Sequence, residues 1–325
     1  MSSSYRGRFA PSPTGPLHFG SLVAALASYL DARAAGGRWL LRIEDVDMPR
    51  NVPGADEAIL RTLTAFGFEW DGEPLWQSRR LPRYREILDS LIRQGDLYGC
   101  ACSRREIADT ALAASIDGGV VYPGTCRNGL REGLLARAWR LRVTDASIGF
   151  DDRIQGTLVQ NLAQEVGDFV LLRADGMVAY QLAVVVDDAE AGITDVVRGA
   201  DLVDSTPRQI WLQQRLNYPL PRYAHLPVAT NLAGEKLSKQ TLAPAVDESE
   251  GVALLVTALR FLGQEVPDEV SRMGYPEFWD WAVAHWDMAR VPCRRGLVSP
   301  TVAGNTDGQA HQLVADPAQQ TGMPG

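Results

Sequence analysis

Two short segments of the chain carry side chains that can bind phosphate. The first, residues 11–21, is a turn rich in proline and glycine that contains His18 and Gly20 and separates a predicted strand from a predicted helix. Such a turn presents backbone N–H groups and the positive end of the helix to an anion, and glycine allows a phosphate to approach closely. The His18 imidazole can donate a hydrogen bond to a phosphoryl oxygen. Taken alone, the pattern is also typical of a turn with a purely structural role.

The second segment, residues 234–240, holds both lysines of the chain, Lys236 and Lys239. Every other cationic side chain apart from histidine is an arginine. A compact, rotatable ammonium group makes different contacts from a planar guanidinium, so this placement indicates a specific need for ammonium groups. Chance placement is the alternative. With His18, the two lysines are candidates to face the phosphates of a nucleotide and to stabilise the charge that develops on them.

Three charged residues, Arg8, Glu44 and Arg198, are candidates to bind an amino acid, and Glu44 and Arg198 lie at the predicted carboxyl ends of strands. Guanidinium groups bind carboxylates through two parallel hydrogen bonds, and a carboxylate such as that of Glu44 can hold an ammonium group. Each residue alone is more typical of a surface ion pair. Open α/β sheets bind ligands at the carboxyl ends of their strands, however, so the shared position favours a site for an α-amino acid.

Three of the four cysteines, Cys100, Cys102 and Cys126, lie close together in the sequence. Thiolates at this spacing suit tetrahedral Zn²⁺, but a closed zinc site needs four ligands and the region has no histidine. Four cysteines are too few for a disulfide framework. The spacing alone leaves a zinc site and reduced thiols as open alternatives.

Hydrophobic periodicity predicts helices and strands on both sides of a less regular region that is rich in cysteine and glycine. Short apolar runs bounded by turn residues are typical of buried parallel strands, and alternation of polar and apolar residues is typical of half-buried ones. One predicted helix starts near Gly20, and the others cover residues 83–94, 252–262 and 276–288. The predicted strands are 37–43, 138–143, 182–186 and 193–197.

These elements predict an α/β fold in which a doubly wound parallel sheet is interrupted by a small insertion and followed by a short helical region. After Pro292 the sequence is rich in Gly, Ala, Gln, Thr and Pro without periodicity, which predicts a tail with little structure. The predicted segments are 1–98 and 167–245 for the two halves of the sheet, 99–166 for the insertion, 246–292 for the helical region and 293–325 for the tail.

The composition is that of an ordinary soluble globular protein, with 46% hydrophobic and 22% charged residues. A net charge of −8 argues against a general nucleic-acid coat but leaves room for a local basic face. No uncharged stretch has the unbroken apolar run of a membrane span, and no signal-peptide pattern opens the chain. We therefore expect a cytoplasmic monomer that makes no membrane contact.

The phosphate-binding segments resemble the signature motifs of class I aminoacyl-tRNA synthetases. His-Phe-Gly-Ser at 18–21 is similar to His-Ile-Gly-His, and Lys-Leu-Ser-Lys-Gln at 236–240 is similar to Lys-Met-Ser-Lys-Ser. Ser21 and Gln240 depart from those signatures. Four further segments resemble the glutamyl branch of this family, in order, within residues 6 to about 290. They are 8–15, 42–45, 180–188 and 197–202.

The resemblance implies a Rossmann-like sheet and assigns roles to individual residues. It implies an L-glutamate site formed by Arg8, Ala10, Ser12, Glu44, Tyr180 and Arg198. It implies an ATP site formed by His18, Gly20, Ser21, Lys236, Ser238 and Lys239, in which His18, Lys236 and Lys239 act in catalysis with Mg²⁺. It implies a Zn²⁺ site formed by Cys100, Cys102, Tyr122 and Cys126.

The stretch after Gln240 is too short for the anticodon-binding region of a full glutamyl-tRNA synthetase. The chain therefore resembles the short paralogues that activate glutamate without tRNA and attach it to the queuosine base in the anticodon of tRNA(Asp). The alternatives are a truncated synthetase that acts on the acceptor end of tRNA(Glu), an inactive paralogue that binds tRNA, and a nucleotidyltransferase that acts on a small acid. Because a purely binding role would not need His18, Gly20 and the two lysines, these residues favour an enzyme.

Overall fold

The computed structural model describes residues 4–110, 115, 120–237 and 244–303. A first parallel sheet has the strand order β1-β2-β3, formed by β1 (Arg6–Phe9), β2 (Arg38–Ile43) and β3 (Leu75–Trp76). Helix α1 (Phe19–Ala34) connects β1 to β2, and α2 (Ala55–Ala65) precedes β3. The predicted strand at 37–43 and the predicted helix start near Gly20 are confirmed.

A second sheet has the order β7-β6-β10-β9. Strands β9 (Asp195–Gly199) and β10 (Arg222–Leu226) are parallel, whereas β6 (Ser147–Asp152) and β7 (Gly156–Asn161) form an antiparallel hairpin. The two sheets meet at β1 and β9, where the N–H of Thr194 donates to the carbonyl of Arg6 at 3.0 Å. Chain order reverses between these two strands, which is the position where doubly wound sheets bind ligands.

The predicted strand at 182–186 is wrong, because these residues lie within helix α6 (Tyr180–Glu190). Leu182 to Val186 are each at most 1% exposed, so the helix is apolar on every side along this run. A short, continuous apolar run of this kind has no period that distinguishes a buried strand from a buried helix. Helix α6 is the element that leads into β9, and α7 (Thr206–Arg215) leads from β9 to β10.

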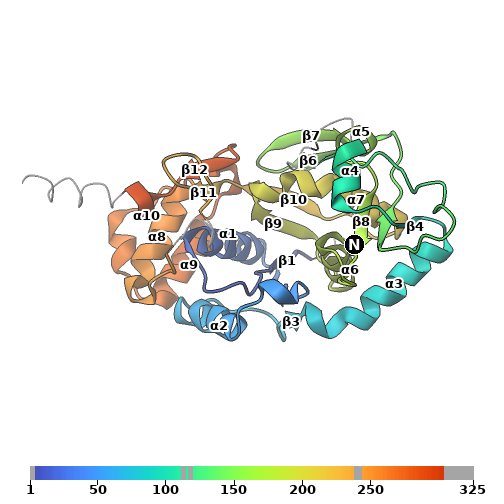
Figure 1. Ribbon diagram of the computed structural model, residues 1–325. Coiled ribbons are helices and arrows are strands. Elements are labelled where there is room, and N and C mark those ends of the chain that lie inside the picture. The colour runs from blue at the N-terminus through green and yellow to red at the C-terminus, as the bar shows by residue number, and fades with distance from the viewer. Residues whose placement is uncertain (1–3, 111–114, 116–119, 238–243, 304–325) are drawn as a thin grey trace, which may run out of the picture.

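A three-stranded antiparallel sheet with the order β4-β5-β8 lies at the end of the molecule opposite the C-terminal helices (Figure 1). It contains β4 (Leu97–Cys100), β5 (Ala138–Leu141) and β8 (Phe169–Leu172), and α4 (Arg104–Thr110) and α5 (Leu162–Glu165) lie nearby in the chain. The predicted strand at 138–143 is confirmed by β5, and the predicted helix at 83–94 by α3 (Leu81–Arg93). The segment boundaries from the sequence stay predictions.

The C-terminal region contains the two predicted helices as α8 (Gly251–Phe261) and α9 (Tyr275–His285). Residues 293–303, predicted to lack structure, instead include β12 (Gly296–Val298) and α10 (Pro300–Ala303). Strand β12 pairs in parallel with β11 (Val228–Thr230), and the Arg295 guanidinium binds both carboxylate oxygens of Asp204 at 3.0 and 3.2 Å. A strand of three residues is too short to show a sequence pattern, and it forms because a partner strand pairs with it. The rest of that prediction, 304–325, lies outside the described residues.

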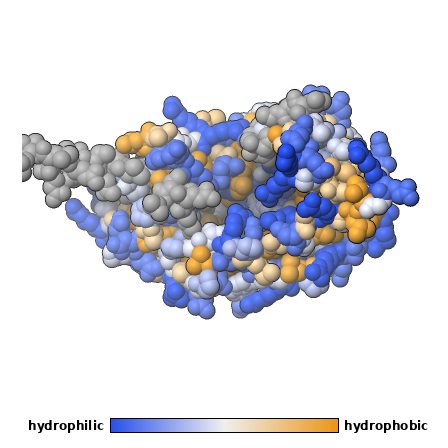
Figure 2. Space-filling view, viewed as in Figure 1, coloured by the Kyte–Doolittle hydropathy of each residue, from blue (hydrophilic) through white to orange (hydrophobic). Residues whose placement is uncertain are grey.

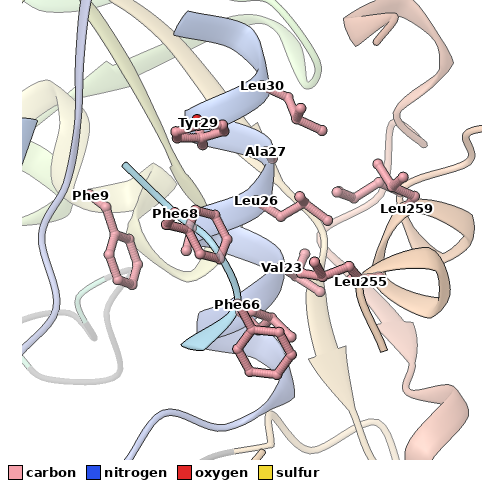
Figure 3. Packing of buried hydrophobic residues seen from close by; sticks show 14 of the residues in the cluster. Phe9, Val23, Leu26, Ala27, Tyr29, Leu30, Phe66, Phe68, Leu255 and Leu259 are labelled. Carbon is pink, nitrogen blue, oxygen red and sulfur yellow. The ribbon is translucent and has the colours of Figure 1, made fainter. Parts of the chain in front are cut away.

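Helix α1 is packed between the first sheet and the C-terminal helices (Figure 3). Its residues Val23, Leu26 and Leu30 face Leu255 and Leu259 of α8, and all five are at most 2% exposed. Burying one such side chain stabilises a fold by about 1.5–3 kcal/mol, so this packing fixes α1 firmly. The N-terminus of α1, which carries the predicted nucleotide-binding residues, is therefore rigidly placed beside β1 and β9.

The face shown in Figure 2 is mostly hydrophilic, with apolar residues scattered over it. Among the residues that the structure describes, no helix is both long enough and apolar enough to cross a lipid bilayer.

Candidate active site

The residues predicted to bind glutamate line one cavity of about 400 Å³ at the junction of β1 and β9. Parallel strands end at the same edge of a sheet, which brings together residues that are far apart in the sequence. Arg8 lies near the end of β1, Glu44 directly follows β2, and Arg198 lies near the end of β9. The full predicted set in the cavity wall is Arg8, Ala10, Ser12, Glu44, Tyr180 and Arg198.

One side of this cavity is a buried network of alternating charges. The Asp188 carboxylate accepts hydrogen bonds from Arg8 Nε at 3.2 Å and from Arg42 Nη1 at 2.5 Å. Arg42 Nη2 also donates to Glu44 Oε1 at 3.0 Å. Arg42 and Asp188 were not predicted as site residues, although both lie in the segments that carry the resemblance. They hold Arg8 and Glu44 in fixed positions at the cavity wall.

The pKa values of the two acids in this network shift in opposite directions. Burial acts to raise the pKa of Asp188, but the guanidinium groups of Arg42 and Arg8 outweigh it and lower that pKa. Burial raises the pKa of Glu44 even though Arg42 pairs with it. A carboxylate whose charge is destabilised by burial gains from an additional cation, so Glu44 is suited to receive a ligand ammonium group.

Arg198 is held differently, by neutral groups. Its Nε donates to His225 Nε2 at 3.0 Å, and its Nη2 donates to Thr206 Oγ1 at 2.8 Å. Its Nη1 is buried and has no hydrogen-bond partner among the described residues. Arg198 also forms no ion pair with any of these residues. A buried guanidinium with a free N–H group at a cavity wall is a binding position for a carboxylate.

Behind Arg198, His225 binds the buried carboxylate of Asp152, with 2.6 Å between His225 Nδ1 and Asp152 Oδ2. Burial lowers the pKa of His225 to about 4, so this imidazole is neutral at pH 7. Burial acts to raise the pKa of Asp152, but the hydrogen bonds from His225 and from backbone N–H groups lower it to about 2. Neither His225 nor Asp152 was predicted as a site residue.

A second, smaller hollow of about 120 Å³ contains the nucleotide-binding candidates that the structure describes. His18, Gly20 and Ser21 at the start of α1 face Lys236 across it. Ser238 and Lys239 lie outside the described residues. Because Asp201 and Lys236 line both hollows, the two hollows are neighbouring parts of one site.

Local contacts fix the two principal side chains of this hollow. His18 caps α1 by accepting a hydrogen bond from the Ser21 N–H at 3.3 Å, and its Nε2 lies 3.1 Å from Ser21 Oγ. A Cβ atom at Gly20 would lie 3.2 Å from the His18 ring, closer than ordinary van der Waals contact, so glycine leaves room for the imidazole. Lys236 Nζ donates to Asp201 Oδ2 at 2.6 Å, between the two hollows.

The predicted metal ligands also come together. The Sγ atoms of Cys100, Cys102 and Cys126 lie within 4.8 Å of one another, and the Tyr122 hydroxyl is 3.4 Å from Cys100 Sγ and 3.9 Å from Cys102 Sγ. Burial and the neighbouring thiols raise the pKa of Cys102 to about 11. Because a bound cation would stabilise thiolates in this setting, three sulfurs and one phenolic oxygen fit a tetrahedral divalent metal ion.

Comparison with known proteins agrees with this arrangement. The family model described as tRNA synthetases class I (E and Q), catalytic domain, matches residues 4–276. A glutamyl-Q tRNA(Asp) synthetase from Dechloromonas aromatica is 64% identical over 92% of this chain and 99% of that protein. One from Aromatoleum aromaticum is 61% identical over 89% of this chain and 90% of that protein.

The crystal structure of a glutamate-tRNA synthetase from Elizabethkingia anophelis superposes with a TM-score of 0.76 at 27% identity, over 96% of this chain and 71% of that one. The predicted Rossmann-like class I synthetase fold is therefore confirmed. The chain belongs to the class I tRNA synthetases of the glutamate and glutamine group, in the branch of the glutamyl-Q tRNA(Asp) synthetases.

Proposed function

We propose that this protein activates L-glutamate with ATP in the absence of tRNA and transfers the glutamyl group to the queuosine base in the anticodon of tRNA(Asp). The observation that carries the glutamate assignment is the buried guanidinium of Arg198. Arg198 lines the cavity, its Nη1 has no hydrogen-bond partner and its charge has no ion-pair partner among the described residues. The names of the relatives in this branch support tRNA(Asp) as the acceptor.

The charges of the cavity support a ligand with one net negative charge. With carboxylates ionised, Arg8 and Arg42 are balanced by Asp188 and Glu44, Lys236 is balanced by Asp201, and Arg50 is balanced by Asp47. Arg198 therefore contributes one uncompensated positive charge. Glutamate carries two carboxylates and one ammonium group, so it complements this charge, whereas glutamine would leave Arg198 unpaired.

In the first step, a carboxylate oxygen of glutamate attacks the α-phosphorus of ATP, a new O–P bond forms, and the bond to pyrophosphate breaks. The reaction needs no covalent bond to the protein, so catalysis depends on alignment and on stabilisation of the developing phosphate charge. We assign His18, Gly20, Ser21, Lys236, Ser238 and Lys239 to the nucleotide site, where His18 and the two lysines would face the phosphates. Mg²⁺ bound to the phosphates would supply further positive charge.

In the second step, a hydroxyl group of the queuosine cyclopentenediol attacks the carbonyl carbon of glutamyl-adenylate. The new ester bond forms, the bond to the phosphate of AMP breaks, and the hydroxyl proton leaves with a base. Arg8, Glu44, Tyr180 and Arg198 would hold the amino acid in place through both steps. Ala10 and Ser12 complete the wall of the same cavity.

We assign Zn²⁺ to Cys100, Cys102, Cys126 and Tyr122, in a structural role. A zinc ion with four protein ligands has no open position for substrate, and it would hold the loop around Tyr122 against β4. The phenolic oxygen already accepts the N–H of Cys126 at 3.0 Å, which indicates that Tyr122 is oriented toward the cluster.

Glutamate-dependent exchange of pyrophosphate into ATP tests the activation step. We expect exchange without tRNA, followed by transfer of labelled glutamate to tRNA(Asp) that contains queuosine but not to tRNA(Asp) that lacks it. Exchange that requires tRNA(Glu), with label on the acceptor end of that tRNA, would instead establish a truncated glutamyl-tRNA synthetase. Absence of exchange under all conditions would favour an inactive, tRNA-binding paralogue.

Replacement of Arg198 tests the assignment of the glutamate cavity. Arg198→Lys keeps the charge but loses the planar fork, so kcat/KM for glutamate should fall about 10²- to 10³-fold. Arg153→Lys is the matched control, because Arg153 binds the buried Asp31 outside the cavity. It should lower thermal stability and leave the KM for glutamate unchanged. Equal KM values for Arg198→Lys and the wild type would remove Arg198 from the site.

A further inference from the structure

We propose that His225 and Asp152 are positioning residues for glutamate binding, which fix the guanidinium of Arg198 at the cavity wall and leave its Nη1 available to the ligand. This inference rests on the proposed function, since it concerns the same amino-acid site. Neither residue belongs to the segments that resemble the synthetase signatures, and neither lines the cavity. Both act behind Arg198.

The three residues form one buried chain of hydrogen bonds across three strands. Arg198 on β9 and His225 on β10 are register partners in a parallel pair, and Asp152 at the end of β6 lies in register with Tyr223 on the other side of β10. Arg198, His225 and Asp152 are 6%, 0% and 5% exposed, respectively. At this depth water cannot replace a lost partner, so each link of the chain constrains the next.

Hydrogen-bond chemistry allows one arrangement of this chain. A guanidinium N–H can only donate, so His225 Nε2 must be the unprotonated acceptor for Arg198 Nε. The proton of a neutral imidazole is then on Nδ1, and Asp152 Oδ2 must accept it. The other carboxylate oxygen of Asp152 accepts N–H groups from Ile154 at 3.0 Å, Gln155 at 2.9 Å and His225 at 3.1 Å. Asp152 therefore fixes both the tautomer of His225 and its backbone.

The neutral imidazole also explains why Arg198 keeps its charge for a ligand. On the opposite side of the cavity, Arg8 binds the carboxylate of Asp188 directly, and its charge is compensated. At Arg198 the His225 imidazole separates the guanidinium from the carboxylate of Asp152. The imidazole accepts the hydrogen bond of Arg198 Nε, so this contact is not an ion pair. The donor geometry of Arg198 is thus fixed while Nη1 stays available, which favours substrates with a second carboxylate over substrates with an amide.

Substitutions in the chain test this role through the kinetics of glutamate-dependent exchange. Asp152→Asn would place an amide N–H next to His225 Nδ1, so the imidazole proton would move to Nε2. Two donors, His225 Nε2–H and Arg198 Nε–H, would then face each other. By analogy with other carboxylate–histidine pairs, we expect the KM for glutamate to rise about 10- to 100-fold. The KM for ATP should stay within about twofold and kcat within about threefold, because none of the three side chains lines the nucleotide hollow.

Variants of His225 keep the test decisive if Asp152→Asn does not fold. His225→Gln retains an amide oxygen that can accept from Arg198, whereas His225→Leu offers no acceptor. The glutamate KM should therefore lie much closer to the wild-type value for His225→Gln than for His225→Leu. Asp168→Asn is the control, because Asp168 is a buried carboxylate, 3% exposed, whose partners Tyr98 and Arg127 lie outside the cavity. It should change thermal stability alone.

The outcomes separate this inference from the proposed function. A selective rise in the glutamate KM, with partial recovery in His225→Gln, supports the positioning role. Wild-type exchange with no selective change in any folded variant at Asp152 or His225 would overturn the role and leave the proposed function intact. Wild-type protein that catalyses no glutamate-dependent exchange would overturn both.

Discussion

The amino-acid cavity and the cysteine cluster are both polar sites, but they differ in how their charges are compensated. In the cavity, Arg8, Arg42, Glu44 and Asp188 neutralise one another through buried ion pairs within the chain. In the cluster, three cysteine sulfur atoms lie within 4.8 Å of one another, and they provide negative charge only after the thiols lose their protons. The Arg140 guanidinium lies 3.8 Å from the centre of the Tyr122 ring and contributes to lowering the pKa of Cys100. One guanidinium cannot balance three thiolates, so further compensating charge has to come from outside the chain.

This difference predicts different dependence on ligands. A site whose charges are already paired keeps its geometry without ligand, which is the condition for fast and selective binding of a small substrate. A site that needs an external cation holds its geometry only while the cation is bound. Two experiments test this difference: removal of an internal charge from the cavity, and removal of the metal from the cluster.

The largest effect is expected for Asp188→Asn. One carboxylate lies between two buried guanidinium groups, so its removal leaves Arg8 and Arg42 with too little negative charge and should destabilise the fold by about 3–5 kcal/mol. Urea unfolding measures this loss, and exchange kinetics should show a raised KM for glutamate. A variant as stable as the wild type would contradict internal charge compensation.

The neighbouring residue offers a matched control for that experiment. Asp187 is also buried, but it pairs with the partly exposed Arg80 and accepts hydrogen bonds from Gln77 and Tyr84. Asp187→Asn should therefore reduce stability without a selective effect on the KM for glutamate. The difference between the two variants isolates the part of the loss that belongs to the cavity.

Removal of the metal should have a smaller effect on stability and none on activation. At a free metal concentration about 100 times Kd, binding stabilises the fold by about 2.7 kcal/mol, and chelation should remove this amount. Cys126→Ser should lower both the zinc content and the stability of the purified protein, whereas Cys293→Ser, at an exposed cysteine, should change neither. Elemental analysis and thermal unfolding measure these changes. Full zinc content in Cys126→Ser would remove that cysteine from the ligand set.

The sequence predicted the cavity well because its residues follow a general rule. Glu44 and Arg198 were identified at the carboxyl ends of predicted strands and Arg8 as a guanidinium for a carboxylate, and parallel strands bring such ends together whatever their separation in the chain. The helix α6 was mistaken for a strand because its run of valines has no period, although Tyr180 at its start was correctly placed in the cavity. The family resemblance thus indicated the position of Tyr180, whereas local pattern did not identify the type of its element.

Local sequence pattern could not predict the partners of the cavity residues. His225 and Asp152 are 73 residues apart, and their contact depends on the pairing of β6 with β10, which the alternation within each strand does not specify. Likewise, the Asp188 side chain acquires its role only once α6 is a helix that directs it toward Arg8 and Arg42. Such contacts follow from tertiary packing, so a sequence identifies the groups that touch a ligand before it identifies those that hold them in place.

The most gradual predicted effect is a pH dependence that belongs to His225. Burial lowers its pKa from 6.5 to about 4 in the folded protein, so the unfolded chain binds more protons than the folded one between these values. The free energy of unfolding should therefore decrease as the pH falls through this window, by about 2–3 kcal/mol in total. Urea unfolding at several pH values between 7 and 4 measures this decrease.

The variant His225→Gln separates the histidine from every other group that titrates in that window. Glutamine does not ionise, so the difference in unfolding free energy between wild type and variant should shrink as the pH falls from 6.5 toward 4. Loss of metal from the cysteines at low pH affects both proteins equally and cancels in this difference. A constant difference across the window would mean that His225 is not held neutral by burial, and the single tautomer required to orient Arg198 would then lose its support.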